Sequence, residues 1–574
     1  MTDREKILSN EYYDMITDYE LPPQISLDIG EDFVYQPIDG ELGITYINRN
    51  NVPPLSVSNY SYTMIPKLYG LGQVLGSGRA GTFDPTPLIE SGITRVQRNP
   101  LNLTGKGVVI GFVDTGIRYE EAVFRNPDGS TRILGIWDQT IQDGTPPEGL
   151  LYGTEYTKEM IDRALQSDDP RSVVPSYDEN GHGSALASVA AGSVLGSGLT
   201  FVGAAPDADI VMVKLRQAKP HLKEYYLVSR ETECYAESDI LTAVKYLESY
   251  AIAVSRALVI CFGLGTNMGD HEGRSALGDY LNTIAVRRSR VVVTAAGAEG
   301  NSAHHYIGVS EEGLRETVDN VEIRVDSGEN GFVAELWGNI SARHIISVKA
   351  PGGEETPQID FRTGSSLEFG FVYEDTLVRI DHVLVEQDSG EELIFFRFVN
   401  PTPGIWTIQV VIVNDTGSES DFHIWLPLDG FLQGDTYFLR PSPYVTLTEP
   451  SNAGDVITVT AYDDAGGGFF AQSGRGYTRL GRIKPEFSAP GVNIDTVLGV
   501  RTGTDLAAAF VAGAAAQFMQ WAVEERNRPW VESRELKSYL IRGAVRDEEG
   551  SYPNRETGYG KLDISGTFDV LAGV

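Results

Sequence analysis

Four short runs of almost continuous apolar residues constrain this chain more than any other feature. They lie at residues 107–116 (GVVIGFVDTG), 208–215 (ADIVMVKL), 257–265 (ALVICFGLG) and 290–297 (RVVVTAAG). Strands that are apolar on both sides are buried on both faces, which is typical of parallel sheets covered by helices. Between the second and third runs, apolar residues recur at helical spacing: Ile240, Ala243, Val244, Leu247, Ala251 and Val254. The pattern predicts an α/β fold with a doubly wound parallel sheet.

A different pattern occupies residues 320–445. Segments such as NVEIRVDSG and GIWTIQVVIVND alternate apolar and polar residues, with turn residues and no helical period between them. This predicts an antiparallel β domain of sandwich or jelly-roll type. It would be inserted into the α/β domain and divide it into residues 101–319 and 446–574. Residues 1–70 are predicted to form a separate N-terminal domain, followed by a Gly/Ser-rich linker within residues 71–100.

Composition excludes several classes of partner and site. The 80 acidic and 46 basic residues give a net charge of -34, which disfavours nucleic acid and anionic membranes. Cys234 and Cys261 alone cannot form a disulfide framework or a cysteine zinc site. No run of 18 apolar residues predicts a membrane span. The first residues lack a signal-peptide pattern, so a location in the cytoplasm or inside a cellular structure is expected.

Three segments carry residues suited to chemistry. Asp114 lies at the end of the first apolar run, His182 lies in NGHGSALASVAAG, and Asp505 follows a glycine turn in TGTDLAAAFVAGAAA. In open parallel sheets, sites lie at the carboxyl ends of strands, and helix N-termini add partial positive charge there. These three residues are therefore the candidate site residues.

In their order and surroundings, these segments resemble those of the subtilisin-like (S8) serine peptidases. Two further motifs agree with the resemblance, FSAPGVNI at residues 487–494 and GYGKLDI at residues 558–564. The finer resemblance is to the clostridial Csp germination proteases, and it extends over residues 214–247. It implies a subtilisin-like α/β domain with an N-terminal prodomain and a jelly-roll insert. No cofactor and no metal are expected.

The resemblance also implies roles for individual residues. Asp114 would orient and stabilise His182, and His182 would be the general base that takes a proton from a serine hydroxyl. The run at residues 257–265 would be an edge strand that binds an extended peptide by β-addition. Its residues expected to bind the peptide are Leu258, Phe262, Gly263, Leu264 and Gly265.

Two residues depart from the family pattern. Asp505 stands where the family has its nucleophilic serine, and Ala298 stands at the position of the oxyanion-hole asparagine. Loss of that serine costs about 10⁶ in rate, and loss of the asparagine about 10² to 10³. The chain is therefore predicted to be a pseudoprotease with a regulatory, sensing or binding role, and the resemblance implies that this role is in spore germination, in a cytoplasmic or spore-associated protein. Its predicted partners are its own prodomain, retained in cis, and a peptide, a protein or an active protease relative.

Alternatives remain for the same site. Thr502, Thr504 or Ser184 could supply the hydroxyl of an active endopeptidase with a rearranged site. The Asp–His–Asp set also matches a three-ligand metal pattern, although subtilisin geometry does not converge these groups on one point. In the remaining interpretation, Asp505 caps its helix and the two carboxylates hold His182 as an imidazolium.

The other histidines are not predicted to be ligands. His271, His304 and His305 lie in segments predicted as loops, where they are expected to be solvated or capping. Cys261 lies on a buried apolar run and is expected to be a small core residue.

Overall fold

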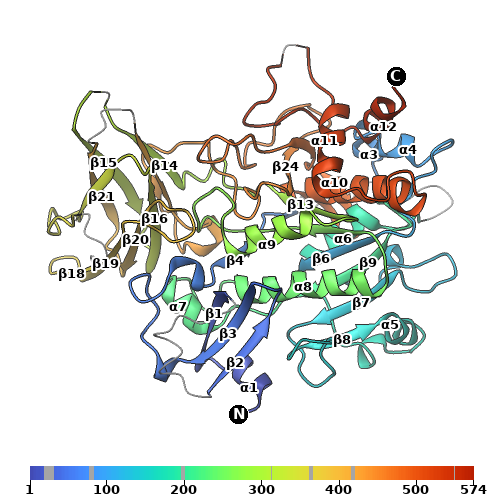
Figure 1. Ribbon diagram of the computed structural model, residues 1–574, viewed down its shortest axis with the longest axis horizontal. Coiled ribbons are helices and arrows are strands. Elements are labelled where there is room, and N and C mark those ends of the chain that lie inside the picture. Colours follow the sequence, from blue (N-terminus) through green and yellow to red (C-terminus); the bar gives the residue numbers. More distant parts are fainter. Residues whose placement is uncertain are drawn as a thin grey trace.

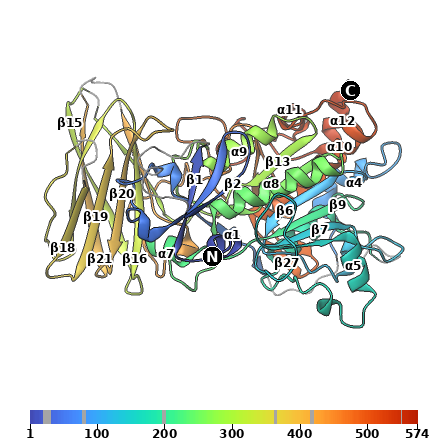
Figure 2. The same ribbon diagram turned by 60° about the horizontal axis from the view of Figure 1, so that its bottom comes forward.

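The computed structural model describes residues 1–18, 32–76, 83–195, 201–311, 313–360, 366–414, 420–548 and 550–573. An α/β unit lies at one end of the molecule and a unit built of antiparallel strands lies at the other (Figure 1). The N-terminal strands lie beside both units, against the helices of the α/β unit (Figure 2).

The α/β unit is built on one sheet of eight strands, in the order β25-β24-β13-β11-β6-β9-β7-β8. In that order the strands are Phe487–Pro490, Ile457–Tyr462, Arg290–Ala295, Leu258–Phe262, Val109–Asp114, Asp209–Lys214, Ile133–Asp138 and Thr154–Thr157. All neighbouring pairs are parallel except β7 and β8. The four apolar runs of the sequence form the adjacent strands β13, β11, β6 and β9, so the predicted α/β sheet is confirmed.

Helices cover both faces of this sheet. On β6, Ile110 and Phe112 pack in the core with α6 (His182–Ala191) and α10 (Thr504–Met519). Val109 and Val113 point to the other face and pack with α8 (Glu237–Ala253) and α9 (Ala276–Ala285). This alternation follows from the two-residue period of a strand, and it explains why these strands are apolar throughout.

The helix α10 is unusually close to the sheet. All of its residues from Thr504 to Met519 are buried, and seven of them are alanines whose small side chains permit close packing. By length and composition alone, the stretch Thr504–Glu524 could cross a membrane, but 89% of its most apolar window lies inside the protein. It is the core helix of the α/β unit.

The second unit consists of two antiparallel sheets packed on a shared apolar core. The six-stranded sheet is β14 (His305–Val309), β22 (Asp421–Trp425), β16 (Gly331–Gly338), β20 (Glu392–Val399), β19 (Thr376–Val383) and β18 (Ser366–Phe371). The four-stranded sheet is β17 (Arg343–Lys349), β21 (Gly404–Val413), β15 (Glu316–Val325) and β23 (Tyr437–Phe438). The predicted antiparallel strands are thus present, but the first begins at His305 rather than near residue 320, because His305–Val309 pairs with β22.

The N-terminal region forms a small sheet of its own, ordered β1 (Tyr12–Asp18), β3 (Leu42–Asn48) and β2 (Phe33–Pro37), after helix α1 (Asp3–Leu8). Apolar residues of these elements join the core that surrounds α8. A buried ionic contact adds to this packing, since the Lys219 ammonium donates to the Asp14 carboxylate. The region is therefore docked on the α/β unit.

The predicted linker at residues 71–100 is wrong for the residues that the structure describes there. Strand β4 (Leu68–Leu71) reaches into this range, and β5 (Leu75–Gly76), α3 (Thr86–Glu90) and α4 (Ile93–Val96) follow within it. Leu88, Ile93 and Val96 are buried in the main core, so apolar contacts hold the segment in place. Residues 77–82 of the predicted linker lie outside the described residues.

The remaining elements are short. They are α5 (Lys158–Leu165), α7 (Pro220–Tyr225), β10 (Tyr235–Ala236), β12 (Leu264–Gly265), β26 (Ile494–Thr496), β27 (Gly499–Thr502), α11 (Ser533–Gly543) and α12 (Ile564–Ala572).

Candidate functional site

Asp114, His182 and Asp505 meet at the carboxyl ends of the central strands. Asp114 is the last residue of β6, His182 is the first of α6, and Asp505 is the second of α10. The His182 Nδ1 lies 2.9 Å from each carboxylate oxygen of Asp114, and its Nε2 lies 2.9 Å from Asp505 Oδ2. All three side chains are at least 95% buried. The structure therefore places the imidazole between two carboxylates.

A small residue allows α6 to begin this close to β6. A Cβ added to Gly183 would lie 2.3 Å from the carbonyl oxygen of Gly116 and 3.1 Å from the Asp114 side chain. The backbone N–H of Gly183 also donates to the Thr115 hydroxyl at 3.1 Å. The Gly after His182 thus sets the distance between the histidine and Asp114.

Both ring nitrogens of His182 face an acceptor, which favours the imidazolium. Burial on its own would lower the pKa of His182, but Asp114 and Asp505 together raise that pKa well above its ordinary value. Burial also raises the pKa of Asp505, and the neighbouring His182 offsets part of this rise. A protonated His182 has no lone pair with which to accept a proton, so this arrangement is not poised for base catalysis.

The predicted helix cap at Asp505 is wrong. The cap position of α10 is Gly503, which has no side chain that could accept a hydrogen bond from the helix. Asp505 lies inside the first turn, where its negative charge still suits the helix dipole. Its carboxylate turns toward His182 instead of toward the free backbone N–H groups.

None of the three nearby hydroxyls is hydrogen-bonded to His182 among the described residues. The Ser184 hydroxyl donates to Asp178 at 2.6 Å, and the Thr502 hydroxyl accepts from the N–H of Asn493 at 2.9 Å. The Thr504 hydroxyl is buried, and it is not hydrogen-bonded to His182 in the part of the chain that the structure describes. A substitute nucleophile would therefore require rearrangement of the site.

Ala298 follows β13 and lies on the same cavity as Asp505. Its methyl side chain offers no hydrogen-bond donor to a developing oxyanion. The position identified from the sequence is thus close to the triad but lacks the donor group that hydrolysis would use.

The predicted peptide-binding strand is only partly correct. Strand β11 is not an edge strand, because β13 and β6 flank it, and Leu258 and Phe262 are buried on the side of α8 and α9. Beyond its end, Leu264 and Gly265 form β12, which pairs with Leu71 and Gly70 of β4. The carbonyl oxygen of Gly263 accepts a hydrogen bond from the N–H of Gly72 at 3.2 Å.

An extended segment of the chain itself therefore lies in the cleft beside the triad. On its other edge, β4 pairs with β10 through Tyr69 and Tyr235. A Cβ added to Gly72 would lie 1.9 Å from Asp505 Oδ2, so a larger residue here would force the carboxylate or β4 to move. The next residue, Gln73, lies against the start of α10. A Cβ added to Gly503 would lie 2.4 Å from the carbonyl oxygen of Gln73.

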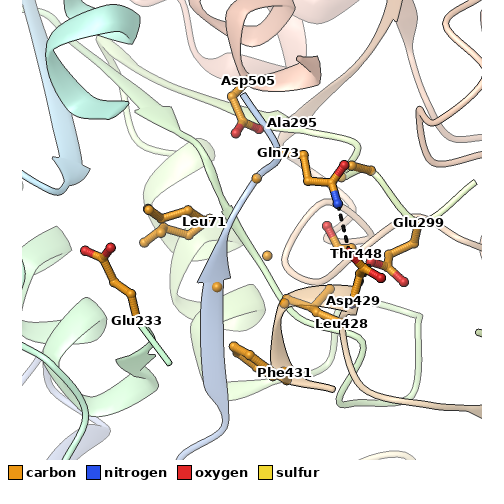
Figure 3. Close-up of a pocket in the computed structure, with 17 residues that line it drawn as sticks. Leu71, Gln73, Glu233, Ala295, Glu299, Leu428, Asp429, Phe431, Thr448 and Asp505 are labelled. Carbon is orange, nitrogen blue, oxygen red and sulfur yellow. Dashed lines mark hydrogen bonds between the residues drawn. The ribbon is translucent and has the colours of Figure 1, made fainter. Parts of the chain in front are cut away.

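The antiparallel unit contributes contacts that the sequence pattern did not indicate. Asp429 accepts a hydrogen bond from the Gln73 side chain at 3.2 Å (Figure 3). A Cβ on Gly70 would lie 3.0 Å from Leu428. Farther along, the Tyr62 hydroxyl donates to the buried Glu335 carboxylate at 2.7 Å. The sequence does contain one signal for strand β4, the YGLG stretch at residues 69–72. Its alternating glycines are compatible with a strand that carries no side chains on one of its faces.

The solvated state predicted for three histidines is wrong. His271, His304 and His305 are each at most 4% exposed. His304 donates to Glu299 at 2.7 Å, His305 belongs to β14, and His271 stacks on Trp425. Cys261 is buried in the core, as predicted.

Among the residues that the structure describes, no three histidine, cysteine, aspartate or glutamate side chains are arranged to hold a metal ion. In the triad, His182 separates the two carboxylates, and both of its nitrogens are already engaged.

Comparison with known proteins agrees with this geometry. The model of the subtilase family (peptidase S8) matches residues 105–321 and 441–560, which leaves out most of the antiparallel unit. The structure of the Clostridium perfringens CspB protease is similar, with a TM-score of 0.74 and 30% identity. That similarity covers 86% of this chain and all of the CspB chain.

Two relatives of known sequence are also similar. Thermitase of Thermoactinomyces vulgaris is 28% identical over 248 residues, and the serine protease AprX of Bacillus subtilis is 32% identical over 120 residues. These alignments span 43% and 21% of this chain. They cover 64% of thermitase and 19% of AprX, so this chain spans less than two thirds of the length of either relative.

Proposed function

This chain belongs to the subtilase family, and from that premise we propose that it is a member that does not hydrolyse peptide bonds. Its role would be to bind, sense or regulate, with its own N-terminal region retained in the cleft. The observation that carries the proposal is the Asp505 carboxylate, 2.9 Å from His182 Nε2.

In a serine protease, the group that faces this histidine nitrogen is the hydroxyl of the nucleophilic serine. Here the Asp505 carboxylate occupies that position. A carboxylate has no proton to give to the histidine, and an anhydride formed by its attack on an amide would revert. The raised pKa of His182, due to its two acidic neighbours despite burial, opposes its use as a base. Ala298 adds a second loss, because an alanine cannot donate a hydrogen bond to an oxyanion.

The position of β4 supports retention of the N-terminal region. Strand pairing on both edges and the Gly72–Gly263 hydrogen bond hold residues 68–72 as an extended peptide would be held. The Tyr62–Glu335 and Gln73–Asp429 hydrogen bonds tie the same region to the antiparallel unit. In this proposal the segment is an internal, uncut ligand.

The proposal is tested on the purified chain by intact-mass spectrometry after prolonged incubation at neutral pH. We expect one species of full mass, with no fragments ending at Gly72 or beginning at Gln73. A serine-directed fluorophosphonate probe should also fail to label it, while an active subtilase labelled in parallel serves as the control. A cut at Gly72, or stoichiometric labelling, would overturn the proposal.

The place of this function in the cell is also proposed. The likeness to the CspB protease of Clostridium perfringens, together with the sequence resemblance to the Csp branch, supports a regulatory or sensing role in spore germination, in a cytoplasmic or spore-associated protein. An active endopeptidase with a rearranged site is the alternative. Among the described residues, His182 is hydrogen-bonded to Asp114 and Asp505 and to none of the hydroxyls of Ser184, Thr502 and Thr504, so no contact in the site supports this alternative.

A further inference from the structure

A cavity with no lining residue in common with the cleft beside the triad lies where the three parts of the chain meet. The N-terminal region contributes Ile16 and Leu42, the α/β unit contributes Tyr280 of α9, and the antiparallel unit contributes Asp388 from the loop between β19 and β20. Figure 2 shows α9 beside the N-terminal strands. The cavity has a volume of about 970 Å³ including its opening to solvent. A ligand bound there would contact all three parts at once.

One face of α9 forms a wall of this cavity. Ala276, Asp279, Tyr280 and Thr283 line it, and their spacing of three and four residues places them on the same side of the helix. Tyr280 is 4% exposed, and its hydroxyl has no hydrogen-bond partner in the part of the chain that the structure describes. A buried hydroxyl without a partner in a cavity wall is a group that a ligand can satisfy.

Carboxylates from each of the three parts surround the same cavity. Glu41 belongs to the turn between β2 and β3, Asp279 to α9, and Asp388 to the β19–β20 loop. None of these three carboxylates forms an ion pair with another described residue. Arg274 is the only cationic side chain among the lining residues, and it pairs with Asp270 at 3.0 Å. The walls of the cavity are therefore negatively charged.

The fold brings some of these like charges close together across the boundary between two units. Partial burial and the nearby carboxylates of Asp388 and Asp270 raise the pKa of Asp279 to about 6. At neutral pH the ionised Asp279 and Asp388 repel each other, and a cation placed between them would remove this repulsion. The cavity thus favours a positively charged ligand.

The arrangement of the carboxylates indicates what kind of cation fits. They lie on separate elements around the wall, and among the described residues no three histidine, cysteine, aspartate or glutamate side chains are arranged to hold one metal ion. A ligand with several cationic groups joined by an apolar chain can contact dispersed carboxylates at the same time. Leu42 and Met64 supply apolar surface between them.

From these observations we propose that the cavity binds a linear aliphatic polyamine. Its ammonium groups would lie near Glu41, Asp279 and Asp388, and its methylene groups would lie against Leu42 and Met64. One ammonium N–H would donate to the Tyr280 hydroxyl. This inference goes beyond the proposed function and does not depend on it, because none of these residues lies at the triad.

Four cations test the proposal: spermidine, putrescine, butylamine and Mg²⁺. Their binding to the full-length protein is measured by isothermal titration calorimetry at pH 7.5 and constant ionic strength. We expect spermidine to bind about tenfold more tightly than butylamine, with putrescine between them and tighter than Mg²⁺, which has the same charge. The chain carries a net charge of -34, so any cation is attracted to some extent. Equal binding of spermidine and butylamine, or of putrescine and Mg²⁺, would overturn the proposal.

Two double variants separate the cavity from the overall charge. Asp279→Asn/Asp388→Asn should weaken spermidine about three- to tenfold, as expected for the loss of two partly exposed ion pairs. Asp143→Asn/Asp168→Asn is the matched control, because both residues are exposed, neither lines the cavity, and the change in net charge is the same. An equal loss of affinity in the two double variants, or no loss in the first, would contradict the site.

Tyr280→Phe tests the hydroxyl on its own. The ring stays in the core, so the variant should fold, and its melting temperature checks this. We expect spermidine to bind about two- to fivefold more weakly, because one hydrogen bond from an ammonium group is lost. Unchanged affinity would show that the ligand does not reach Tyr280 and would overturn the proposed position.

Discussion

Replacement of Asp505 by asparagine tests how the buried Asp114–His182–Asp505 cluster is held together. Asparagine keeps the shape of the side chain and removes its charge. In the wild type, Asp505 Oδ2 accepts from His182 Nε2 at 2.9 Å, with both groups buried. A hydrogen bond to a charged group contributes about 1.5–3 kcal/mol. His182 keeps Asp114 as a partner, so we expect the loss to stay within this range at pH 6. For a chain of 574 residues, whose unfolding entropy scales as about 2.1 cal/mol/K per residue, this corresponds to a melting temperature about 1–3 °C lower.

The effect of this variant should depend on pH. The pKa of His182 is raised on folding, despite burial, by Asp114 and Asp505. Its contribution to stability is therefore fully present below its ordinary pKa and is lost as the pH rises through the raised value. Burial raises the pKa of Asp505, and His182 offsets only part of this rise, so folding disfavours the ionised carboxylate. Ionisation of Asp505 therefore lowers the stability of the wild type as the pH rises, which is the same direction as the effect of His182. The wild type should lose its advantage over Asp505→Asn as the pH rises from 6 to 10.

The assay is differential scanning calorimetry of both proteins at pH 6, 7, 8, 9 and 10, at constant ionic strength. Asp569→Asn is the control, because Asp569 forms an exposed pair with Arg95 that should contribute less than about 1 kcal/mol. A difference between wild type and Asp505→Asn that stays constant over this range would refute the imidazolium account. So would a variant that is more stable than the wild type at pH 6.

Two further perturbations test how the N-terminal region is held. Gly72→Ala would place a Cβ 1.9 Å from Asp505 Oδ2 and should displace β4. We expect an added protease to cleave this variant near residues 69–76 several-fold faster than the wild type, and an unchanged rate would contradict the tight fit. Tyr62→Phe removes the hydroxyl that donates to the buried Glu335 carboxylate at 2.7 Å. We expect this loss to cost about 1–3 kcal/mol and to lower the melting temperature. An unchanged melting temperature would show that this contact does not stabilise docking.

The central sheet was predictable because burial on both faces leaves a direct trace in the sequence. Val109, Ile110, Phe112 and Val113 pack alternately against helices on opposite faces, so the whole strand must be apolar. The triad positions were identifiable for a related reason, because strand ends and helix starts of this fold converge at one edge of the sheet. Asp505 is identifiable as the unusual residue because the segment around it resembles that of a known family.

The predictions that are wrong concern segments whose contacts are distant in sequence. Gly70 and Gly72 lie in a glycine-rich stretch that is typical of a linker. They nevertheless belong to or follow β4, because β10 and β12 pair with that strand, and these partners lie about 165 to 195 positions further along the chain. His304 and His305 lie in a polar stretch, but Glu299 and β22 bury them. A single sequence contains no local signal of such pairing, because the burial of these residues is decided by the partner strand or carboxylate.

The central claim, that the scaffold is intact while the hydrolytic chemistry is lost, is tested most directly by restoring the missing groups. The wild type and the Asp505→Ser/Ala298→Asn double variant are compared for hydrolysis of a fluorogenic peptide and for cleavage after Gly72. The account predicts no hydrolysis by the wild type and measurable hydrolysis by the double variant, which regains a nucleophile beside His182 and an oxyanion donor. Hydrolysis by the wild type that His182→Ala abolishes would contradict it.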